Sequence, residues 1–101
     1  MKENKIPYKK IIFVCTNLRE GETACSNFER GKNAGEELVK LLREEVKKRG
    51  LKGKIRVARS GCMDLCARGP NLMFFDEKGN SEWYSEVNDG DIPALAERFF
   101  A

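Results

Sequence analysis

Hydrophobic and polar positions recur with two different periods along the first half of the chain. Residues 10–15 are an apolar, β-branched run of strand length. Asn33 and Glu36 stand at the spacing of a helix cap, and the stretch after them has one apolar face and ends in basic residues and Gly50. That face holds Leu38, Leu41, Leu42 and Val46. Residues 54–59 alternate charged with apolar positions, which predicts a second strand and a right-handed βαβ unit with parallel strands.

The second half of the chain is typical of a hairpin followed by a helix. Residues 72–75 and 83–87 have strand-like sequences and flank a polar turn at residues 76–80. The last element begins near Asp89 or Asp91 and has one apolar face. That face holds Ile92, Leu95, Ala96 and Phe99. The order β-α-β-β-β-α predicts a single α/β domain with a mixed four-stranded sheet and two main helices.

Composition narrows the chemistry more than it narrows the fold. The 101 residues include four cysteines and no histidine, which excludes histidine-assisted hydrolysis, zinc sites that mix cysteine with histidine, and haem ligated by histidine. Hydrophobic residues make up 41% and charged residues 35%, as in an ordinary soluble domain. No apolar window approaches the roughly 20 residues of a membrane span, and the N-terminus does not match a secretory signal. We therefore expect a cytoplasmic protein with no membrane insertion, in which thiolate ligation or a redox dithiol is favoured over disulfides.

The four cysteines fall into two pairs. Nine residues separate Cys15 from Cys25, and three separate Cys62 from Cys66. If the first two strands are parallel neighbours, Cys15 and the loop of Cys62 both lie beyond the carboxyl ends of their strands, where α/β sheets usually carry their sites. Four thiolates in one place repel one another and need a strongly positive centre, such as zinc or a pair of ferric ions. The pairs therefore predict a metal centre.

The spacing leaves three functions open. A structural zinc module that binds macromolecules through a four-cysteine site prefers two tight pairs with roughly two to four residues between ligands, and only Cys62 and Cys66 approach that. A 2Fe-2S cluster is wider than one ion and accepts a loop pair and a short pair, so the spacing favours iron and sulfur over zinc. A thioredoxin-like dithiol oxidoreductase is the third function, although its motif has about two residues between the thiols.

Charge is distributed unevenly along the chain, which carries a net +3. Residues 40–59 hold nine basic and two acidic groups, a balance of +7, and residues 76–97 hold one basic and seven acidic groups, a balance of −6. The basic residues are interleaved with glutamates and apolar positions and have no aromatic stacking set beside them, so no nucleic-acid partner is expected. The asymmetry instead predicts orientation toward a charged redox partner.

Several motifs together resemble those of one family. They are CTNLR at 15–19, the cysteine at 25, SGCMDLCARGP at 60–70, the glycine at 79 and WY at 83–84. The chain is similar in them to the thioredoxin-like 2Fe-2S ferredoxins over residues 9–99. The resemblance implies a single thioredoxin-like domain at 1–101 that carries one electron and is not an enzyme. It also implies that Cys15 and Cys25 bind one iron and that Cys62 and Cys66 bind the other.

The same resemblance implies partners and surroundings for the cluster. The family includes small homodimeric ferredoxins and domains of NADH dehydrogenases and hydrogenases, so a reductase, hydrogenase or dehydrogenase is the expected redox partner. The aromatic residues of the hairpin exceed what one face can bury, which is consistent with a homodimer. Arg19, Arg59 and Arg68 stand near cysteines and are either tuning charges or solvated surface. Met63 and Leu65 would either shield the cluster or form an apolar docking patch.

Overall fold

The regular elements follow one another in the predicted order. The computed structural model describes residues 1–17, 31, 34–63, 65 and 68–100. Within these residues, the elements are β1 (Lys10–Cys15), α1 (Gly35–Lys48), β2 (Ile55–Ser60), β3 (Leu72–Asp76), β4 (Ser81–Tyr84), the short 3-10 helix η3 (Asp89–Asp91) and α2 (Ile92–Phe100). The predicted α/β class and the β-α-β-β-β-α order are confirmed.

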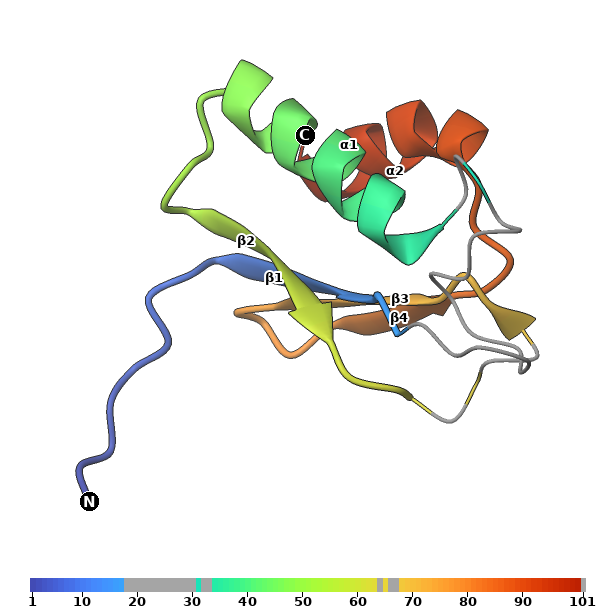
Figure 1. The fold of residues 1–101 in the computed structure, drawn as a ribbon. Coiled ribbons are helices and arrows are strands. Elements are labelled where there is room, and N and C mark those ends of the chain that lie inside the picture. Colours follow the sequence, from blue (N-terminus) through green and yellow to red (C-terminus); the bar gives the residue numbers. More distant parts are fainter. Residues whose placement is uncertain (18–30, 32–33, 64, 66–67, 101) are drawn as a thin grey trace.

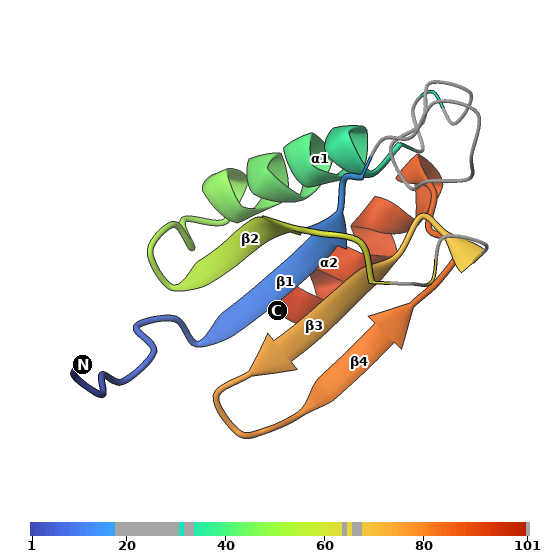
Figure 2. The same cartoon turned by 60° about the horizontal axis from the view of Figure 1, so that its bottom comes forward.

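The four strands form one mixed sheet in the order β2-β1-β3-β4 (Figure 2). β1 runs parallel to β2, with Cys15 opposite Ser60, and antiparallel to β3. β3 and β4 form the antiparallel hairpin, and both α1 and α2 cover the same face of the sheet (Figure 1). The predicted parallel pairing of the first two strands is therefore confirmed.

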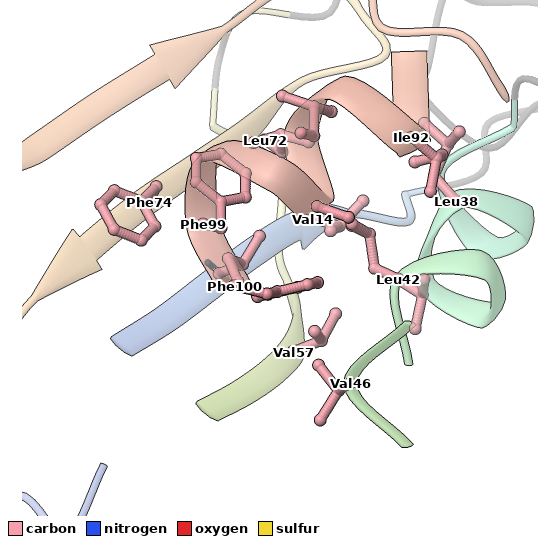
Figure 3. Packing of buried hydrophobic residues seen from close by; sticks show 14 of the residues in the cluster. Val14, Leu38, Leu42, Val46, Val57, Leu72, Phe74, Ile92, Phe99 and Phe100 are labelled. Carbon is pink, nitrogen blue, oxygen red and sulfur yellow. The ribbon is translucent and has the colours of Figure 1, made fainter. Parts of the chain in front are cut away.

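Helix and sheet bury one shared core between them (Figure 3). Because side chains alternate along a strand, Ile12, Val14, Val57, Leu72 and Phe74 all face the helices, and each is less than a tenth exposed. The helices contribute Leu38, Leu42, Val46, Ile92, Leu95, Ala96 and Phe99. The ring of Phe99 stacks on Phe74 at a centroid distance of 4.5 Å. The apolar faces predicted for both helices are thus the faces that pack, with Leu41 only partly buried against the core.

Some predicted boundaries are wrong, for local reasons. The hairpin strand predicted at residues 83–87 is β4, which begins at Ser81 because the Asp76 carboxylate accepts hydrogen bonds from Lys78 and Asn80 and closes the turn early. Gly79 adopts a φ of +88° in this turn, a conformation that favours glycine. Strand β2 is shifted one residue from the prediction. The N-cap of α1 is Ala34 rather than Asn33, which lies outside the described residues.

Candidate metal centre

The two described cysteines lie at the same end of the sheet. Cys15 is the last residue of β1 and stands opposite Ser60, the last residue of β2. Cys62 follows Ser60 by two positions. The prediction that Cys15 and the loop of Cys62 lie at the carboxyl ends of parallel strands is therefore confirmed for these two residues. The other predicted ligands, Cys25 and Cys66, lie outside the described residues.

Cys15 points to the side of the sheet that lacks the helices. Ile12 and Val14 face the helices, so by alternation Cys15 faces the opposite way, yet it is only 1% exposed. Cys62 and its neighbours Met63 and Leu65 are half-buried. The end of the sheet therefore offers one buried and one partly accessible sulfur donor. Because the sequence has no histidine, the site relies on sulfur donors, and sulfur donors are the usual ligands of an iron-sulfur cluster.

Asn71 is a further residue of this site, and the sequence pattern does not predict it. It lies just before β3 and is 1% exposed. Its main-chain carbonyl accepts a hydrogen bond from the Cys15 N–H at 3.2 Å, and its side-chain amide donates to the Leu65 carbonyl at 2.7 Å. The indole N–H of Trp83 donates to Asn71 Oδ1 at 2.9 Å. An asparagine after a proline is typical of an exposed turn, so the local sequence carries no signal of this burial.

The two described arginines near the cysteines have specific side-chain partners. Arg59 forms a hydrogen-bonded ion pair with Glu36 on α1, and the hydrogen bond from Arg59 is the main cause that lowers the pKa of the Glu36 carboxyl below its usual range. The guanidinium of Arg68 lies 5.0 Å from the centre of the Trp83 ring, a cation–π distance. Arg19 lies outside the described residues. Both side chains are exposed, so Arg59 and Arg68 have partners at the surface of the molecule.

Comparison with known proteins identifies relatives of the chain. None of the available family models matches it. A protein described as a 2Fe-2S ferredoxin from Clostridium pasteurianum is 32% identical over 89 residues, which cover 88% of this chain and 82% of that protein. A crystal structure of the thioredoxin-like [2Fe-2S] ferredoxin from Aquifex aeolicus superposes with a TM-score of 0.73 and 25% identity, covering 90% and 84% of the two chains. A second structure described by the same words gives a TM-score of 0.74 at 23% identity, covering 92% and 81%.

The fold and the cysteine end of the sheet define a thioredoxin-like domain with sulfur donors beyond its parallel strands. The chain belongs to the 2Fe-2S ferredoxin family, as its identity to the clostridial relative over most of both chains shows. Members of this family are one-electron carriers with a 2Fe-2S cluster and not catalytic enzymes, which decides against the zinc module and the dithiol oxidoreductase. In the described part of the chain, the helices are too short or too polar to cross a membrane.

Proposed function

We propose that Cys15, Cys25, Cys62 and Cys66 hold the 2Fe-2S cluster of this ferredoxin, the first two on one iron and the last two on the other. The observation that supports this assignment is the placement of Cys15 and Cys62 at the same end of the sheet. The donor set fits the group, because thiolates are the usual ligands of 2Fe-2S clusters. The bound cluster would accept and release one electron.

The chain's own residues have three tasks in this function. Cys15, which is 1% exposed, supplies a ligand that water does not reach, whereas half-buried Cys62 lies closer to the surface. Burial of Cys15 lowers the rate of ligand exchange, and the position of Cys62 nearer the surface brings the redox centre close to a partner. The surrounding hydrogen bonds hold both segments in place before the electron arrives.

The ligand assignment is tested by replacing each cysteine with alanine. We expect Cys62→Ala and Cys25→Ala to lose iron and the visible absorption bands that bleach with dithionite. Ser60→Ala is the matched control, because it removes a polar side chain at the end of β2 and leaves all four thiols. A Cys25→Ala protein with undiminished iron and an unchanged spectrum would remove that residue from the ligand set.

A charged redox protein is the partner that we propose, namely a reductase, hydrogenase or dehydrogenase with which the ferredoxin works or within whose complex it acts. The basic stretch of residues 40–59 covers most of α1 and β2, whereas the acidic stretch 76–97 includes β4. β2 and β4 are the two edges of the sheet, so the charge separation runs across it. Such a dipole orients the encounter. The rate of electron exchange should fall as salt rises, and a rate independent of salt would exclude this steering.

We further propose a homodimer formed through the helix-free face of the sheet, defined by Ile11, Phe13, Met73, Phe75 and Trp83. The strand register places Phe13, Met73 and Trp83 in one row across three strands. Phe75 and Trp83 are each 41% exposed, and Phe13 contacts Phe75 at 6.0 Å between ring centroids. A second copy would cover this apolar surface. Sedimentation equilibrium at micromolar concentration tests it, and a monomer there would exclude the dimer.

We also propose that residues 1–101 form one domain and that the protein works in the cytoplasm. Within the described residues, one hydrophobic cluster between the sheet and the two helices supports the single domain. We expect limited proteolysis of the loaded protein to leave one resistant core that includes both helices and the sheet, and two separately resistant fragments would contradict it. Recovery of the native protein in the cytosolic fraction of its source would test the location, and a periplasmic or membrane fraction would overturn it.

A further inference from the structure

We propose that Asn71 is a positioning residue for the redox centre, which it serves by joining the segments of both cysteine pairs through its main chain and its buried side chain. The proposal rests on the ligand set given above. The main-chain carbonyl of Asn71 accepts a hydrogen bond from the N–H of Cys15. The side-chain amide of Asn71 donates one to the carbonyl of Leu65, which directly precedes Cys66 in the sequence. One residue thus restrains a ligand on β1 and the segment between the other two ligands.

The orientation of the Asn71 amide follows from its partners. The Leu65 carbonyl only accepts hydrogen bonds, and the Trp83 indole N–H only donates them. The Asn71 NH2 group must therefore face Leu65, at 2.7 Å, and its oxygen must face Trp83, at 2.9 Å. A reversed amide would set two donors against each other and two acceptors against each other. The residue therefore has one bonded orientation, which suits a rigid support.

Trp83 binds the side chain of Asn71 and in turn contacts Arg68. The indole of Trp83 lies on β4 and carries the Arg68 guanidinium over its ring at 5.0 Å. Main-chain bonds join the same regions, since the N–H of Glu86 donates to the Arg68 carbonyl at 2.8 Å and the N–H of Val87 donates to the Pro70 carbonyl at 3.1 Å. Arg68 and Pro70 are therefore connected to β4 and to the residues that follow it, directly beside Asn71.

Because Asn71 is buried, breaking one of its hydrogen bonds is energetically costly. Asn71 is 1% exposed, so a broken hydrogen bond here leaves a polar group that water cannot easily satisfy. Positions of ligating sulfurs and the N–H groups near them set the potential and the electronic symmetry of an iron-sulfur cluster. A change at Asn71 should therefore reach the cluster although Asn71 supplies no ligand.

The test compares Asn71→Leu with Asn4→Leu in the cluster-loaded protein. Asn71→Leu has almost the same shape but removes both the donor to Leu65 and the acceptor for Trp83, whereas Asn4 is exposed in the N-terminal segment. For Asn71→Leu we expect altered g-values in the electron paramagnetic resonance spectrum of the reduced protein and a shifted midpoint potential. We also expect cluster loss to a chelator to be roughly tenfold faster, because a buried hydrogen bond is lost. Asn4→Leu should match the wild type in all three.

A second variant keeps the test decisive if Asn71→Leu does not fold. Trp83→Phe keeps an aromatic ring under Arg68 but removes the donor to Asn71 Oδ1, and we expect it to change the same spectrum by a smaller amount. Unchanged g-values and loss rates in a folded Asn71→Leu, or in Trp83→Phe where the first variant is unfolded, would overturn the role. Equal potential shifts in Asn71→Leu and Asn4→Leu would also overturn it. Failure of the ligand set itself would appear separately, as cysteine variants that keep their iron.

Discussion

The two faces of the sheet differ in what covers them and in what they carry. On the face toward α1 and α2, Ile12, Val14 and Leu72 are fully buried and Phe74 is 7% exposed. On the helix-free face, the comparable side chain of Phe75 is 41% exposed. The first face therefore supplies the burial that stabilises the fold. The second face is free to carry the residues of the site and a contact with another molecule.

Cys15 is protected from water although it lies on the less covered face of the sheet. Cys15 belongs to the helix-free face by alternation, yet it is as buried as the core residues. The side chain of Asn71, just before β3, reaches the Leu65 carbonyl, so Leu65 lies near this end of the sheet. The helix-free face is thus closed at Cys15, whereas Phe75 leaves it open to water further along the strands.

The largest expected effect is the difference between two phenylalanines on opposite sides of the sheet. Phe99 is fully buried and contacts the rings of Phe74, Tyr84 and Phe100. Phe99→Ala should lower the free energy of unfolding by about 3–5 kcal/mol through lost burial and a new cavity. Phe75→Ala should lower it by less than about 1 kcal/mol in the monomer, because the side chain already contacts water. Denaturant unfolding at low protein concentration measures both.

Comparable losses for the two variants would contradict this division between the faces. Ala94→Gly offers a third reference, since Ala94 is an exposed position of α2. It should cost about 1 kcal/mol through helix propensity alone. A Phe99→Ala value near that reference would show that α2 contributes little to the core.

The covered face could be predicted from the sequence because local periodicity determines it. The apolar spacing of α1 and α2 identifies the sides that pack, and the β-branched run at residues 10–15 identifies β1. The position of Cys15 at the end of that run then follows from counting residues. The element order and the parallel pairing could likewise be predicted, because a helical crossover between two strands imposes them.

The hydrogen bonds of the site could not be predicted, because they join residues far apart in the sequence. Trp83 and Asn71 are twelve positions apart and meet only after the hairpin has paired. Glu36 stands four residues before Lys40, a favourable helix pairing, yet its described ion pair runs to Arg59 on β2. That choice depends on how α1 crosses the sheet. The start of β4 differs from the prediction for a local reason, since the Asp76 carboxylate accepts a hydrogen bond from Asn80, four residues on, and shortens the turn.

An intermediate effect is expected for association through the helix-free face. Phe75→Glu places a charge in the middle of the proposed contact, and two such charges meet in a symmetric dimer. The dissociation constant of the dimer should rise roughly tenfold or more. Ala94→Glu adds the same charge on an exposed position of α2 and should leave association unchanged. Analytical ultracentrifugation over a concentration series measures both variants, and equal dissociation constants would place the contact elsewhere.

The smallest expected effect lies where the covered face meets water, at Tyr84 on β4. Its hydroxyl donates to Glu82 Oε2 at 2.7 Å and accepts from Arg98 Nε at 2.9 Å. Burial is the main cause that raises the pKa of Tyr84 above its usual value of 10.0, and the hydrogen bond to Glu82 adds to it. Since the folded pKa is raised, the resulting stabilisation is complete below pH 10 and is lost as pH rises through the folded value.

Ultraviolet titration of the phenolates can isolate this group, because the chain has only two tyrosines. Tyr8→Phe should leave a single phenol that titrates above pH 10, and Tyr84→Phe should remove that late step. Between pH 10 and more alkaline pH, the wild type should lose unfolding free energy through Tyr84, and Tyr84→Phe should not show this loss. A Tyr8→Phe protein whose phenol titrates at its ordinary value would show that α2 leaves this edge of the covered face open to water.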